Sequence, residues 1–261
     1  MISQLAHIDP SARLGNNVTV HPFAFIDKGT VIGDNCVIMP YASIMEGTTL
    51  GSDVKVYQGA VVGADPQDFR WKGVPSHCRI GDKAIIREHV IINRGFISPE
   101  GTRIEENVVI MANSHVGHDS CIERNCVLGN GVTIAGGVNV GHGTILSSNV
   151  ILHEGVRVGT LALIKGGCRI SSNVPPFTII AHNPSTYYGV NSYVLSKHAG
   201  YDDATIDDIA KAYRHIYQSS TSLFNALRRI EQDVDPGEAR DKILSFIRTN
   251  EMRIVGERNL E

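Results

Sequence analysis

An aliphatic residue returns at every sixth position along most of this chain, and this period limits the fold more than any other feature. Neither an α-helix, with about 3.6 residues per turn, nor an alternating strand has that period. A solenoid does, when three short strands form one triangular coil of 18 residues and successive coils stack about 4.8 Å apart. The sequence therefore predicts an all-β fold, a parallel β-helix. The aliphatic positions are Ile8, Leu14, Val20, Ile26, Ile32, Ile38, Ile44, Leu50, Val56 and Val62, then Ile80, Ile86 and Ile92, and then Ile104, Ile110, Val116, Ile122, Leu128, Ile134, Val140, Leu146, Leu152, Val158, Ile164 and Ile170.

A second register supports the same fold, because a small or β-branched residue follows each aliphatic residue by four positions. Examples are Ala24, Thr30, Ala42, Ser114, Ser120 and Thr144. Cys36, Cys126 and Cys168 occupy this slot, so we interpret them as small interior residues. That interpretation disfavours catalysis by a cysteine nucleophile.

The repeat is interrupted twice and then ends. Residues 64–79 lose the period and contain the only tryptophan, and residues 95–103 lose it more briefly. Loops that leave a rigid scaffold are common places for function. After Val174-Pro175-Pro176 the repeat stops, and beyond Gly200 apolar residues return at helical spacing. We predict a β-helix domain over 1–185, with the two loops, and a C-terminal α-helical appendage over 186–261, plausibly closing an exposed coil end.

Composition excludes several classes of protein. The formal net charge is −3 and no block of like charge is present, so a nucleic-acid partner is not expected. No apolar run approaches the roughly 20 residues of a membrane span. The first ten residues lack the basic start and apolar stretch of a signal peptide. We expect a soluble, cytoplasmic protein.

The segment Asn113–Asp119 carries the most chemistry. His118 is the third residue of its hexad, a position that faces out of the prism, and Asp119 follows it. An outward imidazole beside a carboxylate can act as a general base near neutral pH. One coil later the same position is Gly136, which leaves backbone N–H groups accessible, as an oxyanion hole requires. Two coils later it is Glu154, next to His153.

Six short motifs are spread over residues 1–198. They are Gln67-Asp68-Phe69-Arg70, Ile86-Arg87-Glu88, Asn93-Arg94-Gly95, His115-Val116-Gly117-His118-Asp119, Val174-Pro175-Pro176 and Gly189-Val190-Asn191. Together they resemble the bacterial UDP-N-acetylglucosamine 3-O-acyltransferases, a family of hexapeptide-repeat acyltransferases. This resemblance implies a left-handed β-helix and the first step of lipid A biosynthesis, in which a 3-hydroxyacyl chain passes from acyl carrier protein to the sugar 3-hydroxyl.

The resemblance also implies roles for single residues. His118 matches the catalytic base, Asp119 biases its imidazole, and Gly136 falls where the oxyanion amide lies. Gly166 falls where acyl length is measured, and a glycine there leaves room for a long chain. The chain departs from the family where Asn93 and Gly137 stand for histidine, Glu154 for glutamine, Lys197-His198 for an arginine pair and Tyr193 for an acid. The positions implied to bind substrate are Asp68, Arg70, His115, His153, Glu154, Asn191 and Lys197.

The expected partners are acyl carrier protein, UDP-N-acetylglucosamine and two further copies of the chain in a homotrimer. No cofactor or metal is needed. Three alternatives stay open: an acetyl-CoA-dependent acetyltransferase acting on an amino-sugar nucleotide, a zinc β-helix carbonic anhydrase and a non-catalytic scaffold. The carbonic anhydrases pair two ligands five positions apart, whereas His115 and His118 are three apart. The donor that supports turnover separates the first alternative from the main hypothesis.

Overall fold

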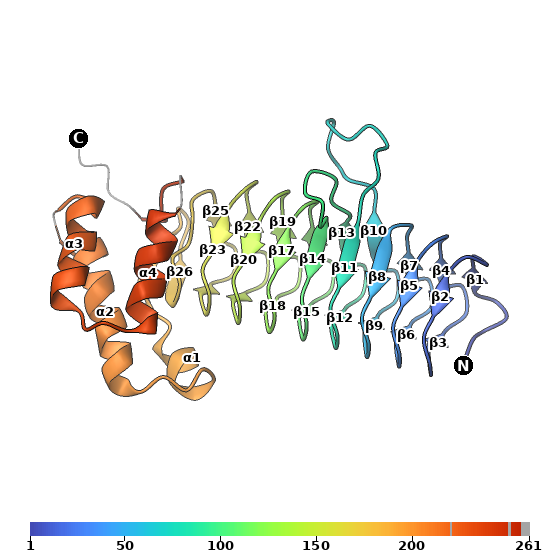
Figure 1. The fold of residues 1–261 in the computed structure, drawn as a ribbon, viewed down its shortest axis with the longest axis horizontal. Coiled ribbons are helices and arrows are strands. Elements are labelled where there is room, and N and C mark those ends of the chain that lie inside the picture. The colour runs from blue at the N-terminus through green and yellow to red at the C-terminus, as the bar shows by residue number, and fades with distance from the viewer. Residues whose placement is uncertain (220, 250–251, 257–261) are drawn as a thin grey trace.

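The computed structural model describes residues 1–219, 221–249 and 252–256. In these residues the chain winds through three parallel sheets in turn, so that each coil adds one short strand to each sheet (Figure 1). The three sheets form the wall of a prism. Within this wall each strand pairs in parallel with the equivalent strands of the coils before and after it. The predicted prism of hexapeptide coils followed by helices is confirmed.

We number the sheets in the order in which the chain visits them. Sheet 1 contains β1 (His7–Ile8), β4 (Phe25–Ile26), β7 (Ser43–Ile44), β10 (Val61–Ala64), β13 (Ile91–Asn93), β16 (His115–Val116), β19 (Thr133–Ile134), β22 (Ile151–Leu152) and β25 (Arg169–Ile170). Sheet 2 contains β2 (Arg13–Leu14), β5 (Val31–Ile32), β8 (Thr48–Leu50), β11 (Cys78–Ile80), β14 (Thr102–Ile104), β17 (Cys121–Ile122), β20 (Asn139–Val140) and β23 (Arg157–Val158). Sheet 3 contains β3 (Thr19–Val20), β6 (Val37–Ile38), β9 (Lys55–Val56), β12 (Ile85–Ile86), β15 (Val109–Ile110), β18 (Val127–Leu128), β21 (Ile145–Leu146), β24 (Leu163–Ile164), β26 (Thr178–Ala181) and β27 (Thr186–Val190).

Both sequence registers point into the prism. From Val20 to Ile170 the repeated aliphatic residues are at most 3% exposed, and those at the N-terminal end, Ile8 and Leu14, are partly buried. In the small slot, buried hydroxyls bond to carbonyls of the next coil: Ser114 Oγ donates to Gly129 O and Thr144 Oγ1 to Gly159 O, each at 2.9 Å. These bonds satisfy polar groups that would otherwise be costly to bury. The three slot cysteines are also buried, as predicted, and burial raises the pKa of Cys126 to about 12.

The two loops leave the wall at one corner without displacing its column of buried aliphatic residues, although a bulge follows Val62 where the first loop begins. Ile44 pairs with Val62 eighteen residues later, Val62 with Ile92 thirty later, and Ile92 with Val116 twenty-four later. Loop 64–79 connects sheet 1 to sheet 2, and so does loop 95–103 one coil further on. Both project from the same edge in Figure 1. We call this edge corner 1–2, and the other two edges corner 2–3 and corner 3–1.

The C-terminal region is mostly helical, as predicted, but two elements were not anticipated. Its three longer helices are α2 (Asp203–Tyr217), α3 (Leu223–Asp233) and α4 (Glu238–Arg248). The side chains of Asp202 and Ser222 cap the first two. The short helix α1 (Ser192–Lys197) and the antiparallel strand β27 were missed. β27 pairs with β26 and therefore belongs to sheet 3 of the β-helix. The predicted boundary after residue 185 places this strand in the helical appendage instead.

The helical region closes the last coil. Asn173 donates its backbone N–H to Arg253 O at 2.8 Å and its carbonyl accepts from Val255. Val255, only 4% exposed, packs with the prism core, while Ile209, Tyr213 and neighbouring residues form a second core among the helices. The last coil is thus covered, as expected for an end that would otherwise expose unpaired strand edges. Among the described helices, none is long and apolar enough to cross a bilayer.

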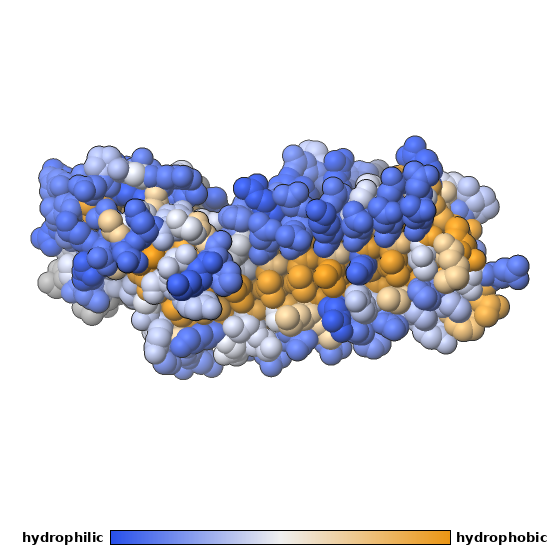
Figure 2. Space-filling view, turned by 90° about the horizontal axis from the view of Figure 1, so that it is seen from below, coloured by the Kyte–Doolittle hydropathy of each residue, from blue (hydrophilic) through white to orange (hydrophobic). Residues whose placement is uncertain are grey.

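Sheet 3 presents apolar side chains on its outer face as well as its inner face. The outward residue of each strand from β12 to β26 is aliphatic and half-buried. Figure 2, which views this face, shows an apolar band along the prism. Strands that are apolar on both faces are typical of buried sheets. The residues of this band are Val37, Ile85, Val109, Val127, Ile145, Leu163 and Ile179.

Candidate active site

Three successive coils build the candidate site at corner 1–2. His115 of β16 pairs with Thr133 of β19, which pairs with Ile151 of β22. The turns that follow these strands therefore stack in the order His118, Gly136, Glu154, as the 18-residue spacing predicted. Because the turns are fixed by the wall beneath them, their side chains have defined mutual positions.

His118 lies outside the prism wall, as predicted, but it is not a solvated surface residue. Its Nδ1 is 2.9 Å from Asp119 Oδ2, and its Nε2 is 3.2 Å from Asp68 Oδ2. The Phe96 ring lies against it, with centroids 5.3 Å apart. Only 7% of His118 is exposed, because side chains from both loops cover it. An imidazole that a carboxylate orients in a sheltered site can act as a general base.

Asp119 fixes the second loop in addition to contacting His118. Its carboxylate accepts from the backbone N–H groups of Phe96, Ile97 and Ser98 at 3.2, 2.9 and 2.8 Å. The residue adopts the left-handed conformation, with φ 58°, which aspartate tolerates better than most residues. Sequence reasoning missed both this role and Phe96, since the interrupted period gave no indication of how the loop folds.

Asp68 and Arg70 bring the first loop onto the same corner. Arg70 Nε lies 3.0 and 2.9 Å from the two Asp68 oxygens, and its Nη2 lies 2.5 Å from Asp68 Oδ2. The same Nη2 donates to Glu154 Oε1 at 3.0 Å. The hydrogen bonds from Arg70 hold the pKa of the Asp68 carboxyl well below its usual range, with a smaller effect from His118. Asp68 is therefore a permanent anion beside the imidazole, and Arg70 spans two coils from His118 to Glu154.

His115 supports the base of the first loop. Its Nε2 is 2.7 Å from Asn93 Oδ1, and Asn93 Nδ2 donates to Asp65 O at 2.5 Å, where the loop begins. Burial lowers the pKa of His115, so the ring stays neutral at neutral pH. Asn93 was recorded only as a departure from the family, and the structure shows why an amide suits the position: it accepts from the imidazole and donates to the loop.

Only glycine fits at position 136, beside the imidazole of His118. A Cβ at this position would lie 2.5 Å from His118 Nε2 and 2.6 Å from Cε1. Within the described residues the Gly136 N–H donates no hydrogen bond, while the next amide, of Gly137, donates to His118 O at 2.8 Å. A free backbone donor next to the reacting nitrogen is the arrangement that an oxyanion site requires.

The structure does not bring all predicted site residues together in one chain. His118, Glu154 and the exposed His153 share corner 1–2, whereas Gly166 is exposed on corner 3–1, between β24 and β25. Asn191 is 2% exposed and its amide donates to Leu161 O on corner 2–3. Lys197 is exposed at the end of α1, beyond the last coil. No groove along a single corner reaches all of them.

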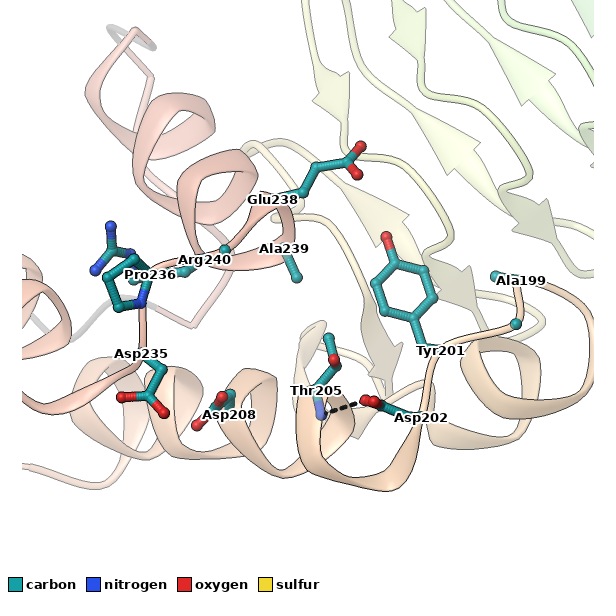
Figure 3. Close-up of a pocket in the computed structure, with 12 residues that line it drawn as sticks. Ala199, Tyr201, Asp202, Thr205, Asp208, Asp235, Pro236, Glu238, Ala239 and Arg240 are labelled. Carbon is teal, nitrogen blue, oxygen red and sulfur yellow. Dashed lines mark hydrogen bonds between the residues drawn. The ribbon is translucent and has the colours of Figure 1, made fainter.

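A hollow of about 500 Å³ lies away from this corner, between the turn before α2 and the start of α4 (Figure 3). Asp202, Asp208, Asp235 and Glu238 line it, and the Asp202 carboxylate is already used to cap α2 through Thr205 N–H. It contains no histidine or cysteine. Across the described residues, no three or more His, Cys, Asp or Glu side chains are grouped to hold a metal ion.

Known proteins resemble this chain over nearly its whole length. The family model described as bacterial transferase hexapeptide matches residues 29–64 and 101–136, and the model for domain 2 of UDP-N-acetylglucosamine O-acyltransferase matches 173–255. The crystal structure of a UDP-N-acetylglucosamine acyltransferase from Bacteroides fragilis superposes with a TM-score of 0.96 at 40% identity, over 98% of this chain and all of that one. The Francisella novicida enzyme gives 0.94 at 30% identity, over 99% and 95%.

Curated relatives carry the same name. An acyl-[acyl-carrier-protein]–UDP-N-acetylglucosamine O-acyltransferase from Thermodesulfovibrio yellowstonii is 32% identical over 97% of this chain and 98% of its own length. The protein of that name from Gloeothece citriformis is 37% identical over 68% of this chain, a match that spans 64% of the relative. Fold and site together define a hexapeptide-repeat acyltransferase. Within that class, the chain belongs to the acyl-[acyl-carrier-protein]–UDP-N-acetylglucosamine O-acyltransferase family.

Proposed function

We propose that this chain transfers a 3-hydroxyacyl group from acyl carrier protein to the 3-hydroxyl of UDP-N-acetylglucosamine, in the cytoplasm, as the first step of lipid A biosynthesis. The observation that carries the proposal is the His118 imidazole, held by Asp119 on one nitrogen and in contact with bare backbone at Gly136 on the other side. Membership of the family indicates which substrates are used. The position of the imidazole indicates how the acyl group is transferred, by general-base catalysis.

The proton path follows from the two imidazole nitrogens. In the reacting tautomer Nδ1–H donates to Asp119, and Nε2 becomes the proton acceptor when the sugar hydroxyl takes the place of Asp68 Oδ2, which lies 3.2 Å from it in the free protein. Nε2 takes the proton from the sugar hydroxyl as that oxygen attacks the thioester carbonyl. The imidazolium so formed lies between the carboxylates of Asp119 and Asp68, which stabilise its charge. When the C–S bond breaks, the imidazolium returns the proton to the departing thiolate of the carrier protein.

The negative charge on the carbonyl oxygen needs a second group. The Gly136 N–H is the donor we assign to it, since it adjoins Nε2 and is free of other partners in the described chain. Asp68, Arg70 and His153 contact the nucleotide sugar in this proposal, and His115 holds the base of loop 64–79 beneath it. No step requires a cofactor.

The test supplies UDP-N-acetylglucosamine with either a 3-hydroxyacyl carrier-protein thioester or acetyl-CoA, and follows the product by mass spectrometry. We expect transfer from the carrier protein alone, and loss of about 10²- to 10⁴-fold of that rate in His118→Ala. Thermal stability should stay close to wild type, because the side chain lies outside the core. Turnover from acetyl-CoA alone would favour the acetyltransferase alternative, and a fully active variant would exclude His118 as the base.

A homotrimer completes the proposal. Gly166 and Asn191 lie on corners other than that of His118, so a ligand can touch all three only if different copies supply them. The apolar band on sheet 3 is the surface we assign to the contact, because an exposed band of this size is typical of an interface (Figure 2). In the resulting groove Gly166 limits acyl length. Its Cβ position is open apart from Ser148 O at 3.0 Å, so a larger side chain would project outward.

Light scattering coupled to size-exclusion chromatography tests the assembly. Val127→Asp places a charge in the middle of the band and should convert trimers to monomers. Thr49→Asp, on the exposed polar face of sheet 2, is the control and should leave the mass unchanged. A trimer that survives Val127→Asp would show that another face makes the contact.

A further inference from the structure

Arg70 is shared between two carboxylates that belong to different parts of the molecule. Asp68 lies on the same loop, whereas Glu154 lies 84 residues further along the chain on the wall. Besides the contact of Asp68 with His118, the Arg70–Glu154 bond joins the tip of loop 64–79 to the wall. Both side chains are exposed, Arg70 by 58% and Glu154 by 66%. Exposed pairs of this kind are weak and exchange readily with other anions.

The carboxylates at this corner repel an anionic ligand. Such a ligand can bind there only if it replaces Glu154 as a partner of Arg70. Asp68 and Asp119 contact the imidazole, Glu154 lies two coils further along the same corner, and the guanidinium of Arg70 bonds to Asp68 and Glu154. Asp68 and Asp119 are partly or fully buried and tied to other groups, while Glu154 has no partner other than Arg70 in the described residues. A diphosphate that approached this corner would be repelled unless Glu154 gave up the guanidinium.

Arg70 can accept a new partner without leaving Asp68. Its Nε and Nη2 bond to the Asp68 carboxylate, and Nη1 makes no hydrogen bond within the described chain. A phosphate oxygen can therefore take Nη1 and the place of Glu154 on Nη2, in the two-point geometry that arginine favours. The loop would then turn from the wall to the ligand, with Asp68 still attached.

We infer that Glu154 competes with the diphosphate of the nucleotide sugar for Arg70, and thereby sets the affinity of the site for that substrate. This inference rests on the proposed function. It differs from the family resemblance at one position, since the resemblance implies that Glu154 binds substrate, whereas here Glu154 competes with it. Glu154 acts through Arg70 as a positioning residue. In the free protein it holds the first loop against the wall, and in the complex it is released to solvent.

Glu154→Gln tests the competition, since it keeps the size of the side chain and removes its charge. We expect KM for UDP-N-acetylglucosamine to fall by about two- to fivefold with kcat within twofold of wild type. The difference should shrink as salt is raised, because the lost interaction is between exposed charges. Glu231→Gln is the matched control: Glu231 is an exposed glutamate of α3, paired with Arg248 at 2.8 Å among the C-terminal helices. Its KM should not change.

Trp71 supplies an independent measurement, because it is the only tryptophan and follows Arg70 in the loop. Titration of wild type with UDP should shift the fluorescence of Trp71, and ligand-free Glu154→Gln should already show part of that shift. A KM that rises, a kcat that falls alone, an equal change in the Glu231→Gln control or a tryptophan that ignores UDP would each overturn the inference. Wild type that transfers no acyl group from carrier protein would instead refute the proposed function.

Discussion

The two loops that cover His118 are held by different kinds of contact. Loop 95–103 is fixed through its backbone, because Asp119, whose side chain is only 6% exposed, accepts from three consecutive N–H groups. Loop 64–79 reaches the imidazole through the side chains of Asp68 and Arg70, and Arg70 is more than half exposed. The first arrangement behaves as part of the wall. The second can be exchanged for contacts with a ligand.

This difference assigns separate duties to the loops. The second loop encloses the imidazole and holds Phe96 against it, and we expect this contact to persist when substrate binds. In the proposed function the first loop carries the charges that meet the nucleotide sugar, and we expect it to move when that ligand binds. Variants of the residues between the loops and the wall therefore test the contrast directly.

Asp119→Asn should have the largest effect. The amide keeps the size and tolerance for the left-handed backbone, but it places a donor where Nδ1–H and the loop N–H groups need an acceptor. We expect kcat to fall by about 10²- to 10⁴-fold and hydrogen exchange in residues 95–103 to accelerate. Asp53→Asn, another left-handed aspartate with φ 60°, is the control and should be silent. Slow exchange in loop 95–103 of Asp119→Asn would show that other contacts fix it.

Gly136→Ala should rank second. The added Cβ would lie 2.5 Å from Nε2, so the imidazole must shift away from its position between the loops. Displacement by about 1 Å can lower a rate about 10²-fold. We expect that loss in kcat with little change in thermal stability, since a side chain rather than backbone yields. Gly189→Ala, where no atom lies within 4 Å of the Cβ, is the control. Equal activities of the two variants would remove Gly136 from the site.

Asp68→Asn should produce a smaller effect, confined to the first loop. The imidazolium loses one of its two anionic neighbours, and kcat should fall by about fivefold. Hydrogen exchange should accelerate in residues 64–79 and stay unchanged in 95–103. Because the hydrogen bonds from Arg70 hold the pKa of Asp68 well below its usual range, protonation of Asp68 should not shape the wild-type pH–rate profile near neutral pH. Loosening of both loops would contradict the separation between them.

The smallest effect concerns the support beneath the first loop. Burial lowers the pKa of His115 below its ordinary value of 6.5, so the unfolded chain takes up this proton at a higher pH than the folded chain. Stability from this group is present above pH 6.5 and is lost as the pH falls through the folded value. His115→Gln should flatten that part of the stability profile, as measured by urea unfolding between pH 5 and 8. Identical slopes in the two proteins would exclude the effect.

Most of the fold could be predicted from the sequence because each six-residue repeat forms one strand and turn of the β-helix. Each hexad places one aliphatic and one small residue inside the prism, and the structure buries both registers. The elements that were missed, α1 and β27, are short and lie where the period has ended. Their positions depend on packing against the last coil, a tertiary effect that local patterns do not carry.

The candidate site could be predicted only in part, for the same reason. His118, Gly136 and Glu154 are 18 residues apart, so their stacking follows from the repeat. Phe96 lies in a loop without a period, and nothing in the sequence places its ring on His118. Gly166 follows His118 by 48 residues, which is not a multiple of 18, so the spacing itself indicated a different corner. The resemblance supplied a role for that residue without its location.

The unchanged pairing on either side of the loops has a consequence for how such enzymes diversify. Ile44, Val62, Ile92 and Val116 stack in register although different lengths of chain leave the corner between them. Folding of the wall is therefore indifferent to what is inserted there. Loops of other lengths and compositions should be tolerated in place of residues 64–79 without any change to the core. Evolution can therefore alter substrate specificity through this loop while the β-helix stays the same.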